Sequence, residues 1–136
     1  MQDGFRFRIE RDDLSELIIA AKLDVTIQEV GAEIIVEAIG DVDLTTVKIL
    51  EVPLTESVRA TVDATKAVFL SVDLRRVDFI DSAGLALLVT ARKRLALAQC
   101  SLQILLTPDK QPDRVLRLSR LDMIMALKYD NRDSAF

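Results

Sequence analysis

Residues 77–85 read Val-Asp-Phe-Ile-Asp-Ser-Ala-Gly-Leu and join an apolar run to a helical pattern. The preceding run, residues 67–74, is rich in Val, Phe and Leu, as expected of a central strand covered on at least one face. Residues 82–98 then place small and apolar side chains at helical spacing, namely Gly84, Leu87, Leu88, Ala91, Leu95 and Ala98. A second apolar run at residues 102–106 completes a strand, helix and strand, which predicts a right-handed crossover unit.

The residues before this unit predict further strands and helices. Two β-branched runs, residues 23–28 and 33–39, flank Gly31 and predict a β-hairpin. Alternation of Phe or Ile with charged residues over residues 5–10 predicts a short strand. Residues 13–21 carry a capping signal and an amphipathic helical stripe. We expect this helix to pack on its own domain, with a dimer contact as the alternative.

The segment between the hairpin and the central strand allows two interpretations. Residues 47–52 resemble a strand, whereas Asp43 and Thr45 could cap a helix that starts there. Proline is accepted in the first turn of a helix, and the following apolar residues keep a helical spacing. We therefore predict a helix over about residues 53–64, beginning at Pro53.

Patterns near the end of the chain predict a helix over residues 113–120 and a last strand over residues 124–129. Strands and helices thus alternate along most of the chain. This alternation predicts a single α/β domain with a mixed sheet. At 136 residues, half of them hydrophobic, the chain can bury a core without disulfides or a structural metal.

The composition also excludes several classes of function. The chain has no histidine and one cysteine, Cys100, which removes Ser-His-Asp and Cys-His catalysis, His-ligated metals and Cys-rich zinc sites. The net charge of -4 disfavours a nucleic-acid partner. The longest stretch without charge, residues 95–108, is too short to cross a bilayer. We expect a cytoplasmic protein that has no cofactor, no metal and no direct membrane insertion.

Ser82 is the candidate functional residue, because it lies where the strand ends and the helix begins. α/β proteins often bind ligands or accept modification at this position. Neither a Gly-x-Ser-x-Gly pattern nor a histidine base is present, so we expect no enzyme activity. The hydroxyl can instead receive a phosphoryl group from a kinase. In the structural alternative, Ser82 only caps the helix.

Two motifs resemble one known family. Residues 79–85 are similar to the signature of STAS domains, specifically of bacterial anti-sigma factor antagonists, and residues 40–43, Gly-Asp-Val-Asp, are similar to that family's turn after its second strand. The resemblance covers residues 23–130. It implies a STAS-like mixed sheet with helices packed mainly on one face, in which residues 23–136 form the domain and residues 1–22 an N-terminal extension.

The resemblance also implies a switch. With Ser82 unmodified, such a protein binds an anti-sigma factor that is also a serine kinase; phosphorylation of Ser82 releases that partner, and a PP2C-like phosphatase reverses the change. The residues around the phosphoacceptor are then Asp41, Asp43, Asp81, Ala83 and Gly84. Ala83 stands where many members have a second hydroxyl residue, so Ser82 is the expected acceptor.

Helical spacing places four residues beside Ser82 that we expect to contact the partner: Leu85, Ala86, Val89 and Lys93. Leu85 and Val89 suit the core equally well, and Asp41 and Asp43 suit a turn or a helix cap. Two other functions stay open: a non-switching scaffold subunit of a stress-signalling or membrane transport complex, and a small-ligand or nucleotide sensor with its cleft at Asp41, Asp43 and Ser82. A homodimer is a further alternative.

Overall fold

The computed structural model describes residues 4–7, 23–64 and 69–129. Its six strands form one sheet in sequence order: β1 (Gly4–Phe7), β2 (Leu23–Val30), β3 (Glu33–Val42), β4 (Phe69–Ile80), β5 (Ser101–Leu106) and β6 (Ala126–Tyr129). Three α-helices and a 3-10 turn complete the fold: α1 (Val47–Asp63), α2 (Ser82–Leu97), α3 (Gln111–Leu118) and η1 (Leu121–Met123). No helix in these ranges is long and apolar enough to cross a membrane.

The sheet is mixed, as predicted. β1, β2 and β3 pair antiparallel, whereas β3, β4, β5 and β6 pair parallel. The predicted hairpin is confirmed: β2 and β3 pair up to Val30 and Glu33, and Gly31 takes a φ of 61° in the turn between them. The predicted crossover is confirmed as well, because α2 connects the parallel neighbours β4 and β5.

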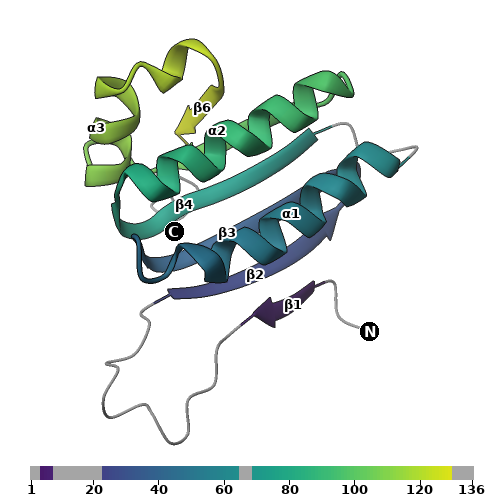
Figure 1. Ribbon diagram of the computed structural model, residues 1–136, viewed down its shortest axis with the longest axis horizontal. Helices are drawn as coiled ribbons and strands as arrows, with labels where there is room; N and C mark the ends of the chain where they lie inside the picture. Colours follow the sequence, from purple (N-terminus) through teal and green to yellow (C-terminus); the bar gives the residue numbers. More distant parts are fainter. Residues whose placement is uncertain (1–3, 8–22, 65–68, 130–136) are drawn as a thin grey trace, which may run out of the picture.

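The long helices α1 and α2 lie side by side on one face of the sheet (Figure 1). The core fills the space between them and the sheet, where Val36, Val72 and Ile104 are fully buried beneath Leu50 and Leu88. α3 lies at the end of β4, and none of the described helices covers the opposite face (Figure 1). The expectation of helices packed mainly on one face is confirmed.

The predicted start of α1 at Pro53 is wrong. The helix begins at Val47, so that Pro53 lies inside it and residues 47–52 are not a strand. Ile49, Leu50, Pro53 and Leu54 are all buried, which shows that the apolar face of the helix continues through the proline. Proline has no N–H to donate within a helix, and this loss usually breaks a solvent-exposed helix. In α1, burial of the Pro53 ring in the core offsets the loss.

Other boundaries also differ from the predictions. β4 continues to Ile80, whereas the sequence predicted an end near residue 74. The register of β4 against β3 shifts twice, between Glu37 and Ile39 and between Gly40 and Asp41. Such bulges break the alternation by which a strand is recognised in a sequence. The first predicted strand is found as β1, which begins at Gly4, and residues 8–10 of that prediction lie outside the described residues. The predicted helix at residues 13–21 lies outside the described residues.

Candidate functional site

The first turn of α2 is capped by Asp81. Its Oδ1 accepts hydrogen bonds from the N–H groups of Ala83 at 2.9 Å and Gly84 at 3.3 Å. The backbone of Asp81 is extended, with φ -111° and ψ -170°, which is the usual conformation of an N-cap residue. The structural alternative for Ser82 is therefore wrong: the carboxylate of Asp81 satisfies the free amides, and Ser82 is the first residue of the helix.

The hydroxyl group of Ser82 takes no part in capping α2. Ser82 is exposed to solvent. Within the described ranges, no side chain or backbone group forms a hydrogen bond with it. The hydroxyl oxygen is therefore accessible from solvent while α2 stays folded.

The turn between β3 and α1 is built around Asp43. Its Oδ1 accepts hydrogen bonds from the Thr45 N–H at 2.9 Å, the Thr45 hydroxyl at 2.7 Å and the Thr46 N–H at 3.2 Å. The hydrogen bond from the Thr45 hydroxyl is the main reason that the pKa of Asp43 lies below its usual value. Thr46 closes the turn by donating to the Asp41 carbonyl oxygen at 2.7 Å. Asp43 thus serves as a turn-forming residue, one of the two roles that its sequence position suggested.

Asp81 also fixes this turn against the start of α2. Its Oδ2 accepts a hydrogen bond from the Leu44 N–H at 3.1 Å, and its own N–H donates to the Val42 carbonyl oxygen at 3.0 Å. One carboxylate therefore holds two separate segments, residues 42–44 and 81–84, at the same end of the sheet. The structure brings Ser82 into the neighbourhood of the Gly-Asp-Val-Asp turn, as the two motifs implied.

The site includes an apolar residue that the sequence analysis missed. Leu44 is 77% exposed, although it lies in the turn that Asp81 holds. A leucine with this exposure on a hydrogen-bonded turn contributes nothing to the core and is open to solvent. The only signal in the sequence is one large apolar residue within an otherwise polar turn.

Gly84 has a packing role. A Cβ atom at this position would lie 2.6 Å from Cγ1 of Ile80 and 2.8 Å from Cγ1 of Val42. Both distances are far below van der Waals contact, so a glycine lets α2 approach the ends of β3 and β4. The neighbouring Ala83 is half-buried. The Ala-Gly pair after Ser82 sets the position of the helix from which the serine projects.

The four predicted contact residues on α2 divide into two groups. Ala86 and Lys93 are exposed. Leu85 and Val89 are half-buried and pack against the core, so only part of each side chain is left for a partner. The accessible surface beside Ser82 is therefore smaller and less apolar on α2 than expected.

Gln111, which the sequence analysis also missed, anchors α3 beside the site. Its side-chain oxygen accepts from the Ile80 N–H at 2.8 Å, and its side-chain nitrogen donates to the Ile80 carbonyl oxygen at 2.9 Å. The amide thus replaces a neighbouring strand at the last residue of β4, directly before Asp81. No sequence pattern distinguishes this glutamine, because its partners are backbone groups of a distant segment.

This arrangement can be compared with known proteins. The sequence profile of the STAS domain family matches residues 24–135, most of the chain. The chain belongs to the STAS domain family. A comparison with curated proteins finds no match.

Solved structures with this STAS fold include an anti-sigma factor antagonist from Mycobacterium paratuberculosis, at 22% identity and a TM-score of 0.70, covering 83% of this chain and 90% of that one. The anti-sigma factor antagonist SpoIIAA in its unphosphorylated form matches at 12% identity and a TM-score of 0.58, with 82% and 93% covered. The Bacillus cell fate determinant SpoIIAA in its phosphorylated form matches at 15% identity and the same TM-score, with 82% and 96% covered. At these identities the likeness establishes the fold.

Proposed function

We propose that this STAS domain is an anti-sigma factor antagonist switched by phosphorylation of Ser82. The unmodified form binds an anti-sigma factor that is also a serine kinase, and the phosphorylated form releases it. One observation carries the proposal: Asp81 caps α2, which leaves the Ser82 hydroxyl exposed and without a structural task. A protein phosphatase of the PP2C type reverses the modification.

The surface around Ser82 supports binding to a protein. Leu44 is exposed in the turn after β3, and Ala86 and Lys93 are exposed on α2. Phe79, two residues before the Asp81 cap, is 42% exposed. Protein interfaces usually have an apolar core and a polar rim, and Leu44 and Phe79 supply exposed apolar side chains in the two segments that meet at Asp81.

The charge of a phosphate explains the release. Phosphorylation adds about -1.5 to -2 charges and three strong acceptor oxygens at the first residue of α2. The helix N-terminus favours this charge, but the neighbouring Asp81 carboxylate opposes it. Burying the phosphate against a partner without matching donors costs several kcal/mol. A penalty of about 4 kcal/mol already weakens binding roughly a thousandfold.

The direct test is to incubate the protein with the anti-sigma kinase of its own organism and ATP, and to count added phosphates by mass spectrometry. We expect one phosphate on the unaltered protein and none on Ser82→Ala. Thr90→Ala, which removes another exposed hydroxyl from the same helix, should be labelled normally. Full labelling of Ser82→Ala would show that the acceptor has been misassigned.

A binding measurement completes the test. Ser82→Asp places a single negative charge at the acceptor and should weaken binding of the kinase, as measured by calorimetry or pull-down. Leu44→Ser should weaken it as well, because it removes the most exposed apolar side chain of the site. If both variants bind as tightly as the unaltered protein, the partner docks elsewhere.

A further inference from the structure

Charge is distributed unevenly along this chain. Residues 23–91 carry five Lys and Arg side chains against twelve Asp and Glu, whereas residues 92–128 carry eight against three. A chain with a net charge of -4 therefore contains one distinctly basic section. Such asymmetry within one chain indicates a partner of negative charge for the basic part of the surface.

The sheet converts this asymmetry along the sequence into an asymmetry in space. Its six strands lie in sequence order, so β1, β2 and β3 form one side of the molecule and β5 and β6 form the other. Figure 1 shows α3, and the chain that leads from it to β6, on the side opposite β1. The acidic and the basic sections of the chain therefore lie on opposite sides of the molecule.

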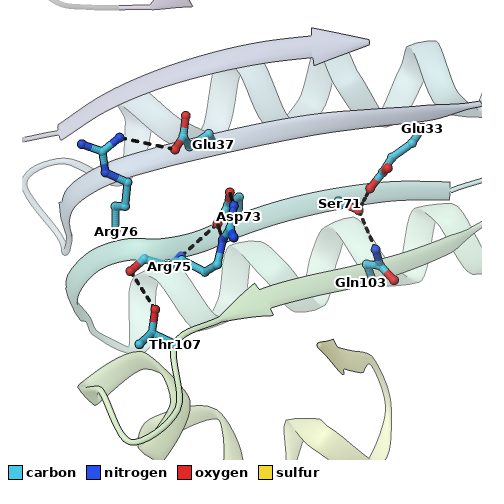
Figure 2. Close-up of polar contacts among 8 residues, drawn as sticks. All are labelled: Glu33, Glu37, Ser71, Asp73, Arg75, Arg76, Gln103 and Thr107. Carbon is cyan, nitrogen blue, oxygen red and sulfur yellow. Dashed lines mark hydrogen bonds and ion pairs between the residues drawn. The ribbon is translucent and has the colours of Figure 1, made fainter. Parts of the chain in front are cut away.

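Carboxylates in the middle of the sheet have cationic partners of their own. Asp73 forms an ion pair with Arg75 at 2.9 Å, and Glu37 lies 3.9 Å from Arg76 (Figure 2). Both arginines belong to β4, in the acidic section of the chain. These carboxylates thus do not neutralise the basic side.

Two arginines on the basic side are exposed and unpaired. Arg120 forms no hydrogen bond or ion pair within the part of the chain that the structure describes. Arg114, one turn before the end of α3, donates to the carbonyl oxygen of Asp109 and to no carboxylate among the described residues. The exposed carboxylates of this segment are those of Asp109 and Asp122, and Asp109 also lies 3.7 Å from Arg117.

Large apolar side chains are exposed in the same segment. Leu118, one turn after Arg114 on α3, is 83% exposed, and Met123 in η1 is 70% exposed. Two consecutive turns hold this stretch compact, with hydrogen bonds from the Arg120 N–H at 3.0 Å and the Met123 N–H at 3.2 Å. We call the four exposed side chains, Arg114, Leu118, Arg120 and Met123, the α3 surface.

From this combination we infer that the α3 surface docks on an anionic membrane, at its surface and without crossing it. Basic side chains attract the headgroups of acidic lipids, and large apolar side chains beside them enter the boundary between headgroups and acyl chains. A nucleic acid would engage the arginines alone and leave Leu118 and Met123 in water. Both kinds of side chain are used only at a lipid surface of negative charge.

The acidic side of the molecule does not prevent this docking. β1 lies five strand spacings from β6, about 24 Å between backbones. Charges are screened over about 8 Å at physiological ionic strength. When the α3 surface faces the membrane, the carboxylates of the hairpin and α1 are therefore too distant to repel the lipids strongly.

The test is flotation of the full chain with lipid vesicles of two compositions. Vesicles of phosphatidylcholine with about one third phosphatidylglycerol should carry the protein, and vesicles of phosphatidylcholine alone should not. Raising the salt concentration from about 0.1 to 1 M shortens the screening length from about 10 to 3 Å and should weaken binding. Equal binding to both kinds of vesicle, or binding to neither, would overturn the inference.

Variants locate the surface that binds. Arg120→Gln should lower the partition coefficient onto anionic vesicles about fivefold, because it removes one cation near the headgroups. Leu118→Ser combined with Met123→Ser should lower it about tenfold, because two large apolar side chains no longer leave water. All three residues are exposed, so the thermal midpoint should stay unchanged.

Matched controls lie on the acidic side. Lys48→Gln removes one exposed cation from α1, and Leu44→Ser removes a leucine that is 77% exposed in the turn after β3. Both controls should bind anionic vesicles as tightly as the unaltered protein. If they lose as much binding as the variants of the α3 surface, the membrane does not select this surface and the inference is wrong.

Sedimentation without vesicles distinguishes a membrane from a second copy of the chain. A dimer that the Leu118→Ser and Met123→Ser pair dissociates would show that another copy covers the α3 surface, and would contradict the inference. Ser82→Ala should bind vesicles like the unaltered protein, so the outcome does not depend on the proposed switch.

Discussion

At the scale of single residues, the site depends on neighbours whose roles differ from what their residue types suggest. Asp81 fills the capping role for which serine is an equally good candidate, and Ser82 is left exposed. The sequence cannot decide between the two, because both types are favoured N-caps and they are adjacent. The deciding factor is the Leu44 N–H, which bonds to the second oxygen of the Asp81 carboxylate. A serine has a single side-chain oxygen and could not serve both segments as well.

Gly84→Ala tests how tightly this end is packed. Alanine favours a helix by up to about 1 kcal/mol over glycine, but the new methyl group would overlap Ile80 and Val42. The overlapping atoms are attached close to the backbone and cannot move away easily. We therefore expect a net loss of about 1 to 3 kcal/mol in the free energy of urea unfolding. Ser82→Ala in the same turn is the control and should change the free energy of unfolding little. If Gly84→Ala has the same free energy of unfolding as the unaltered protein, the contact of Gly84 with Ile80 and Val42 can relax.

At the scale of elements, one side chain of α3, Gln111, pairs with the backbone of β4 in the place of a neighbouring strand. Replacing Gln111 by Ala leaves the N–H and C=O of Ile80 without their partner, which costs about 1 to 3 kcal/mol in the free energy of unfolding. Gln111→Glu keeps the oxygen that accepts from the Ile80 N–H but loses the donating nitrogen, so its free energy of unfolding should lie between those of the unaltered protein and Gln111→Ala. Amide hydrogen exchange at Ile80 should accelerate in the Ala variant; unchanged protection there would mean that α3 is held by other contacts.

The elements also show what a sequence can predict. α2 and the β2–β3 hairpin were predictable because their apolar spacing is regular and their ends carry glycine or a capping residue. The start of α1 at Val47 could not be predicted, because Pro53 favours a helix start at its own position and only its burial in the folded core allows it inside the helix. The length of β4 could not be predicted either, because two register shifts interrupt its pattern. Leu44 and Gln111 were missed because their importance arises only where distant segments meet.

At the scale of the whole molecule, the last strand is tied to α3 through one buried carboxylate. Asp113 accepts hydrogen bonds from the Tyr129 hydroxyl at 2.6 Å, the Asp109 N–H at 2.8 Å and Arg117 at 3.1 Å. Burial opposes the charge of Asp113, but these hydrogen bonds outweigh burial and lower its pKa. Burial, followed by the hydrogen bond to Asp113, raises the pKa of Tyr129 to about 12.

The raised pKa of Tyr129 predicts a loss of stability in alkali. Because the folded state favours the protonated hydroxyl, its contribution is complete below the unfolded pKa of about 10 and is lost as the pH rises through about 12. Urea unfolding of the unaltered protein and of Tyr129→Phe should differ most near neutral pH, and the difference should shrink across this interval. A difference that stays constant with pH would show that the hydroxyl titrates equally in both states.

The short strand β1 has a consequence for self-association. Among the described residues it pairs with Val25, Thr26, Ile27 and Gln28, and so covers half of the eight-residue edge of β2. β6, at the opposite border, is also four residues long. Unpaired borders recruit strands from other molecules, and short ones recruit them poorly. Removing β1 would expose the whole edge of β2 and favour edge-to-edge aggregation.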